Sequence, residues 1–141
     1  WVEGWAAIII GVIAGAIMYA SVRFFDRIGI DDPVGAISVH GIGGIWGLLS
    51  VGFFADGTYG NYALAKPYAV GLFYGGGWGQ LIAQAISVIV VFVWAFGMGY
   101  IVFKLMDKAF GIRVSANEEL QGVDVSEHGT PAYPDFVQIE S

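Results

Sequence analysis

Apolar residues fill three long stretches of the chain in which no Asp, Glu, Lys or Arg occurs. These uncharged stretches are residues 4–22, 33–55 and 67–103. About 20 apolar residues suffice for a helix to cross the hydrocarbon core of a bilayer, where a charged side chain is costly. The first two stretches each suit one crossing, and the third is longer than one upright helix needs and begins with a glycine-rich segment. The pattern predicts three transmembrane helices at about 4–24, 33–55 and 76–106, within a transmembrane region 1–110.

The composition fits a membrane protein and excludes a soluble globular domain. Hydrophobic residues make up 57% of the chain, charged residues make up 13%, and the mean hydropathy is +0.69. A soluble domain usually carries about 25% charged residues. Many of the 22 glycines lie inside the apolar stretches, where small residues let helices pack closely. We therefore expect an all-α, polytopic helical membrane protein.

Each predicted helix carries two glycines four residues apart. The pairs are Gly11 with Gly15, Gly43 with Gly47, and Gly75 with Gly79. Because four residues make about one helical turn, both members of a pair share a face. The pairs predict close packing between helices and indicate no substrate.

The acidity of the chain belongs to its C-terminal end. Seven acidic and two basic residues follow Met106, while the net charge of the whole chain is −6. We interpret residues 111–141 as a polar tail, and with a pI near 4.5 we expect no binding to nucleic acid.

Basic residues near membrane helices accumulate on the cytoplasmic side. Five of the six lie next to the first loop or after the third uncharged stretch, which predicts a multi-pass protein of the cell membrane with a cytoplasmic C-terminus. These five are Arg23, Arg27, Lys104, Lys108 and Arg113.

Several kinds of chemistry find no support in the residues. The chain has no cysteine, so a disulfide framework and a thiolate metal or redox site are excluded. No carboxylate pair or phosphate-binding loop occurs in the predicted helices, so we expect a protein that is not an enzyme and holds no cofactor. The chain opens without a methionine at the edge of the first predicted helix, so we expect it to be the C-terminal piece of a larger protein.

His40 is the only histidine in the three uncharged stretches. On an α-helix that begins after Asp32 it would lie about 12 Å deep in a hydrocarbon core of about 30 Å. Its α-helical face would consist of Ala36, Ile37, Gly43, Gly44 and Gly47, which are mostly small and predict a side chain that points into the bundle. A lone histidine can be structural, but an ionisable group inside a membrane usually marks a transport path or a proton relay. We therefore interpret His40 as a functional residue.

The imidazole of His40 suits some ligands better than others. Desolvation favours its neutral form, which offers one hydrogen-bond donor and one acceptor to a small polar molecule or a proton. No carboxylate, cysteine or second histidine shares its stretch, so we expect no metal site.

Asp31 and Asp32 precede the second predicted helix. Asp32 is expected to cap the free amides of that helix, with Pro33 at the first helical position. The same pair could attract a cation at a cytoplasmic vestibule. Both interpretations stay open at this point.

Local signals also predict structure within the tail. Ser115 and Glu118 have the spacing of a capping box, and Gly122 can end the short helix that follows.

Two separate motifs resemble the ammonium transporter (Amt/Mep/Rh) family, and its Amt branch in particular. Residues 31–47, DDPVGAISVHGIGGIWG, resemble the penultimate transmembrane helix of that family. Residues 111–115 (GIRVS) and 122–129 (GVDVSEHG), with Ala132 and Tyr133, look like its cytoplasmic C-terminal region. The motifs stand in the order and spacing of the family, and the resemblance covers essentially the whole chain.

The resemblance implies an eleven-helix bundle, of which this chain would hold the last three transmembrane helices and the tail. It implies a homotrimer in membrane lipid with one apolar pore per subunit, in which His40 matches the second of two neutral pore histidines. Ammonium would lose its proton outside, and ammonia would pass the histidine pair. The tail would be regulatory and would contact a PII-type signal protein. The matched tail positions are Arg113, Glu118, Gly122, Asp124, His128 and Tyr133.

Two alternative functions stay open within the same fold. An ammonium sensor would bind ammonium and signal through its tail with little flux, and a transport current would distinguish it from a transporter. An Rh-like channel would conduct a neutral gas, although the motifs quoted above favour the Amt branch.

Overall fold

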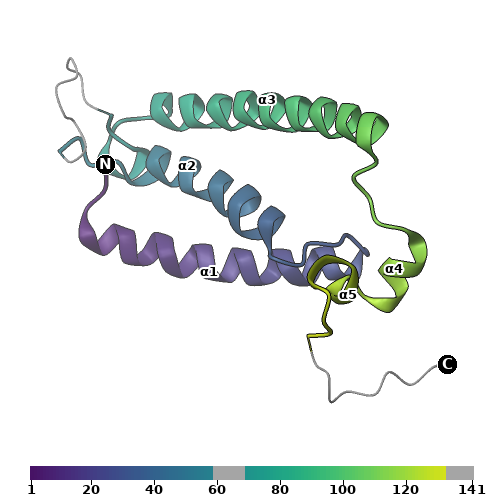
Figure 1. Ribbon diagram of the computed structural model, residues 1–141. Coiled ribbons are helices and arrows are strands. Elements are labelled where there is room, and N and C mark those ends of the chain that lie inside the picture. Colours follow the sequence, from purple (N-terminus) through teal and green to yellow (C-terminus); the bar gives the residue numbers. More distant parts are fainter. Residues whose placement is uncertain (59–68, 133–141) are drawn as a thin grey trace. The chain divides into compact units, whose positions relative to one another are not determined.

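The computed structural model describes residues 1–58 and 69–132 of the chain. Its elements are helical and follow one another as shown in Figure 1. They are α1 (Gly4–Arg27), η1 (Ala36–Ile42), α2 (Gly43–Phe54), η2 (Leu72–Tyr74), α3 (Gly79–Phe110), α4 (Ala116–Gln121) and α5 (Asp124–His128). η1 is a π-helix that runs directly into α2, and η2 is one turn of 3₁₀-helix. The predicted all-α class is confirmed.

Three helical segments in the described part of the chain are long and apolar enough to cross a membrane. They are α1, the continuous segment Ala36–Phe54 made of η1 and α2, and α3. The predicted helical membrane architecture with three candidate spanning helices is therefore confirmed. By their contacts, residues 1–95 and 96–141 form two compact units.

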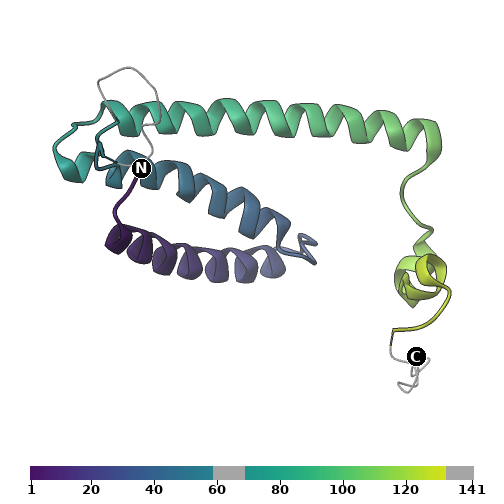
Figure 2. The ribbon, with the colours of Figure 1, turned by 60° about the vertical axis from the view of Figure 1, so that its left-hand side comes forward.

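α1 and α2 lie side by side with opposite directions in the first unit (Figures 1 and 2). The indole nitrogen of Trp46 donates a hydrogen bond of 3.0 Å to the carbonyl of Ile10. Gly43 lies against Met18, since a Cβ placed on this glycine would stand 3.4 Å from the Met18 sulfur. A polar bond and a small residue thus hold the two helices together, as is common between membrane helices.

A second set of contacts joins the start of α1 to the end of α2 and to η2. The carboxylate of Glu3 accepts hydrogen bonds from the Trp5 indole and, at 3.1 Å, from the Tyr74 hydroxyl. The ring of Phe54 meets Trp5 and Phe73 edge to face, with centroid distances of 6.3 and 5.1 Å. Burial and the hydrogen bond to Glu3 raise the pKa of the Tyr74 phenol. The segment before α3 is therefore fixed to the N-terminal end of α1.

The beginning of α3 packs against the backbone of α2. A Cβ placed on Gly52 would lie 2.7 Å from the Cα of Leu81, which is closer than two carbon atoms can approach. Glycine is thus required at this position because two main chains meet there.

The glycine pair predicted at the start of the third helix is wrong. α3 begins at Gly79, whereas Gly75 and Gly77 adopt φ angles of +82° and +70° in the turn before it. Glycine tolerates this left-handed conformation, which a helix cannot continue through. Gly75 and Gly79 therefore do not share a helix face.

The other predicted glycine pairs have different surroundings. Gly43 contacts Met18, but among the described residues nothing lies within 4 Å of a Cβ placed on Gly11, Gly15 or Gly47. Close packing at those three glycines stays a prediction.

α3 ends at Phe110, and Gly111 follows with a φ of +65°. The assignment of residues 1–110 to the membrane and 111–141 to the cytoplasm stays a prediction.

Candidate functional site

His40 lies in η1, two residues after the fully buried Ser38. The structure leaves His40 exposed among the described residues. η1 is a π-helix, so the α-helical spacing used to predict the face around His40 does not hold through this turn. π-helical turns are rare and frequently occur at functional sites. His40 thus lies on a rare type of helical backbone.

The structure corrects the predicted start of the second helix. Residues 33–35 form a turn, Gly35 has a φ of +65°, and the helix begins at Ala36 instead of Pro33. Asp32 nevertheless caps helical amides, but from a greater distance along the chain than expected. Its carboxylate oxygens accept hydrogen bonds from the amides of Ile37 at 3.0 Å and Ser38 at 3.1 Å.

The two aspartates before this helix differ in their surroundings. Asp31 is exposed, whereas Asp32 is partly buried over the first turn of η1. Burial acts to raise the pKa of Asp32, but hydrogen bonds from Ile37 and Ser38 outweigh it and hold that pKa below its ordinary value. Asp32 therefore has a structural role, and a vestibule role for either aspartate stays a prediction.

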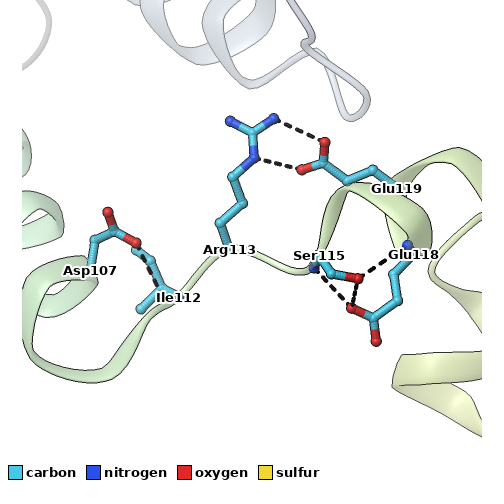
Figure 3. A network of polar contacts seen from close by, with 6 residues as sticks. All are labelled: Asp107, Ile112, Arg113, Ser115, Glu118 and Glu119. Carbon is cyan, nitrogen blue, oxygen red and sulfur yellow. Dashed lines mark hydrogen bonds and ion pairs between the residues drawn. The ribbon is translucent and has the colours of Figure 1, made fainter.

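The predicted capping box in the tail is confirmed (Figure 3). The Glu118 amide donates to the Ser115 hydroxyl oxygen at 3.3 Å, and the Ser115 amide donates to the Glu118 carboxylate at 2.8 Å. Hydrogen bonds from the Ser115 hydroxyl and amide lower the pKa of Glu118. These reciprocal bonds satisfy amides that the first turn of α4 would otherwise leave unpaired.

Arg113 forms a two-pronged ion pair with Glu119 (Figure 3). The guanidinium nitrogens Nε and Nη2 lie 2.6 and 3.0 Å from the two carboxylate oxygens. Hydrogen bonding and the charge of Glu119 raise the pKa of Arg113, and the hydrogen bond from Arg113 lowers the pKa of Glu119. The pair connects the segment after α3 to α4.

Three of the remaining matched tail residues lie at the end of α4 or within α5. Gly122 ends α4 with a φ of +92°, and Asp124 begins α5 and accepts a hydrogen bond of 3.3 Å from the amide of Ala132. His128 is the exposed last residue of α5. Tyr133 lies outside the described residues.

Sequence reasoning missed the contacts that span different elements. Ser21, Ser38 and Glu119 were not singled out, although each has a defined partner in the structure. A signal existed for the two serines, because hydroxyl residues inside apolar helices often bond to a neighbouring helix. The capping box assigns Glu118 to Ser115, but nothing in the local pattern assigns Glu119 to Arg113. Across residues 1–58 and 69–132, no cluster of three potential metal ligands is present.

Comparison with known proteins gives the family. The model of the Ammonium Transporter Family matches residues 1–133. The chain belongs to this family. It is 50% identical over its whole length to ammonium transporter Amt2 of Archaeoglobus fulgidus. It is 39% identical over 94% of its length to ammonium transporter 3 of Dictyostelium discoideum, and 36% identical over 99% to ammonium transporter 1 member 1 of Arabidopsis thaliana.

Membership in the ammonium transporter family confirms the resemblance seen in the two motifs, and the names of these relatives agree with the Amt branch. The family consists of transporters and not of enzymes. The three apolar helices agree with a membrane protein. The chain spans 30%, 31% and 28% of the lengths of the three relatives named above.

Proposed function

We propose that the full-length protein containing this chain transports ammonium across the cell membrane, and that His40 lies on the transport path. The observation that carries the proposal is the exposed imidazole on a π-helical turn, in a chain that is 50% identical to a protein named as an ammonium transporter. Because the chain spans 30% of that relative, the other walls of the path belong to further parts of the protein.

The proposed mechanism separates ammonium from its proton before the apolar passage. An ammonium ion pays a large desolvation cost in an apolar pore, whereas ammonia is neutral and needs only a hydrogen-bond partner. A neutral imidazole can both donate and accept such a bond. Ammonium therefore loses its proton outside, ammonia passes a pair of neutral histidines of which His40 is one, and ammonium forms again inside.

The proposal includes the assembly that the family resemblance implies. The protein is an eleven-helix protomer in a homotrimer, and its C-terminus lies in the cytoplasm, as the distribution of basic residues supports. Asp31 and Asp32 then lie at the cytoplasmic vestibule. The first pore histidine comes from a helix outside this chain.

The tail is proposed to regulate transport through a PII-type signal protein. The capping box and the Arg113–Glu119 ion pair support this, since they give the tail a defined shape that a partner can recognise. Gly122, Asp124, His128 and Tyr133 complete the proposed regulatory segment.

Transport current provides the test. The full-length protein is reconstituted into liposomes and exposed to an ammonium pulse, with His40→Ala and Ile89→Ala in parallel. Ile89 is 62% exposed on α3 and serves as a control for side-chain truncation. We expect a current in the parent and in Ile89→Ala, and a current that is lost or strongly altered in His40→Ala. An unchanged current and selectivity in His40→Ala would contradict the proposed role of His40.

The same measurement distinguishes the alternatives. Ammonium binding without a current or an ammonia flux would identify a sensor instead of a transporter. An ammonia flux without a current would favour a neutral-gas channel.

A further inference from the structure

A buried pair of serines joins α1 to the π-helical turn that carries His40. The Ser21 hydroxyl donates a hydrogen bond of 3.1 Å to the hydroxyl oxygen of Ser38. Ser38 is 0% exposed and Ser21 is 9% exposed. Ser50 is the third buried serine, at 4% exposed, but its hydroxyl bonds to the carbonyl of Gly47 in its own helix at 2.7 Å. The Ser21–Ser38 bond therefore fixes one element against another, which the Ser50 bond does not.

Ser38 is also held through its backbone. Its amide donates to the Asp32 carboxylate at 3.1 Å, beside the bond from the Ile37 amide. At the other end of η1 the amide of Gly43 bonds to the carbonyls of both Ser38 and His40. The hydroxyl, the amide and the carbonyl of Ser38 thus all have defined partners, and two of these partners, Ser21 and Asp32, lie outside the continuous helical segment Ala36–Phe54.

These bonds restrict where His40 can point. His40 follows Ser38 by two residues in the same π-helical turn, so rotation of η1 about its axis would carry both residues together. Rotation of η1 would break the bond to Ser21 and the hydrogen bonds to Asp32. Two apolar side chains at positions 21 and 38 would oppose the same rotation only weakly, because dispersion contacts are not directional. Polar bonds between membrane helices contribute modestly to stability, so this pair is better suited to setting an orientation than to holding the fold.

We propose that Ser38 is a positioning residue for His40, and that its bonds to Ser21 and Asp32 fix the direction in which the imidazole faces the transported molecule. The inference rests on the proposed function, since it assigns His40 a place on the ammonium path. It adds a residue that determines selectivity through the backbone and does not itself touch the substrate.

The test compares Ser38→Ala with Ser50→Ala in the full-length protein in liposomes. Both changes remove one buried hydroxyl, but only the first removes a bond between α1 and η1. The readout is the ratio of the currents carried by ammonium and by methylammonium, which differ by one methyl group. A misplacement of 1 Å can cost about a hundredfold in rate, and for a small rotation we expect Ser38→Ala to change the ratio by about three- to tenfold. Ser50→Ala should leave the ratio unchanged.

Two further variants separate positioning from a general loss of structure. Ser21→Ala should reproduce the changed ratio, and the double variant Ser21→Ala/Ser38→Ala should differ little from Ser38→Ala, because both changes break the same bond. Ser21 is less buried than Ser38, so Ser21→Ala tests the positioning role if the Ser38→Ala protein does not assemble. A lower total current with an unchanged ratio would mean that Ser38 is only structural, and would overturn the inference.

The outcomes also distinguish this inference from the proposed function. If the parent carries no ammonium current, or if His40→Ala changes nothing, the proposed function fails and the positioning role falls with it. If His40→Ala alters the ratio but Ser38→Ala behaves like Ser50→Ala, the proposed function stands and only the positioning role is wrong.

Discussion

The first compact unit and the segment after α3 are both helical, but their polar contacts differ in range. In residues 1–95, hydrogen bonds connect positions far apart in the chain. They join Ser21 with Ser38, Ile10 with Trp46, and Glu3 with Tyr74. In residues 107–132, the described side-chain bonds join positions three to eight residues apart. The first region depends on the fit between elements and the second on local capping, so the two should respond differently to substitution and to pH.

The largest effect is expected where two main chains meet. Gly52→Ala adds a Cβ that would lie 2.7 Å from the Cα of Leu81, and backbone cannot move aside as a flexible side chain can. Overpacking of this kind usually costs about 1–3 kcal/mol and occasionally more. We expect a clearly lower thermal unfolding midpoint for the full-length variant in detergent, measured at a fixed scan rate.

Gly97→Ala is the matched control, since nothing described lies within 4 Å of its added Cβ. Alanine is the better helix former, so this variant should unfold at the same or a higher temperature. Equal midpoints for the two variants would show that α3 does not pack against α2 at Gly52.

A smaller effect is expected at the bond between α1 and α2. Trp46→Phe keeps an aromatic ring but removes the donor to the Ile10 carbonyl, at a cost of about 0.5–1.5 kcal/mol in the free energy of unfolding. Trp94→Phe is the control, because Trp94 is 69% exposed on α3. Denaturation in a mixed-detergent series measures both. A loss in Trp94→Phe that equals the loss in Trp46→Phe would mean that the indole bond contributes nothing specific.

The smallest effect is expected in the tail and depends on pH. The folded pKa of Glu118 is lowered from 4.5, so its stabilising contribution is complete above that value and is lost as pH falls through the folded pKa. We expect amide hydrogen exchange in α4 to accelerate between pH 5.5 and pH 3, relative to an unstructured peptide at each pH. The amides of the apolar first unit should change far less.

Ser115→Ala checks the cause of this pH response. It removes the capping hydroxyl and should raise exchange in α4 at neutral pH, typically by the equivalent of about 1 kcal/mol of local helix stability. Asn117→Ala, on the same helix, should not. If Ser115→Ala retained the full pH response, the capping box would not be its source.

The range of the contacts explains what could be predicted from the sequence. The three apolar helices and the capping box depend on residues close together in the chain, and both are present, although the second helix begins three residues later than predicted. Gly122 likewise ends α4 with a φ of +92°, a conformation that glycine adopts more readily than other residues. These features need no knowledge of what packs against them.

The features that could not be predicted all require a distant partner or a specific backbone geometry. Pro33 is favourable at a helix start, but the left-handed Gly35 delays the helix until Ala36. Gly75 and Gly79 have the spacing of a packing pair, yet a turn separates them. Ser21 and Ser38 are 17 residues apart, and neither local segment identifies the other serine as its partner. The sequence therefore identified His40 as a candidate but could not predict the contacts that surround it.

The π-helix around His40 makes the number of residues in this segment as important for the structure as their identity. A π turn holds more residues than an α turn, so α2 is rotated about its axis relative to an uninterrupted α-helix from Ala36. Each residue of an α-helix advances by about 100°, so loss of Gly41 or Ile42, which lie between His40 and α2, would turn His40 and α2 relative to each other by roughly that angle. The π-helical segment thus sets the angle about the helix axis between His40 and α2, the helix that packs on α1. An insertion or deletion in this segment would change that angle, whereas point substitutions would leave it largely intact.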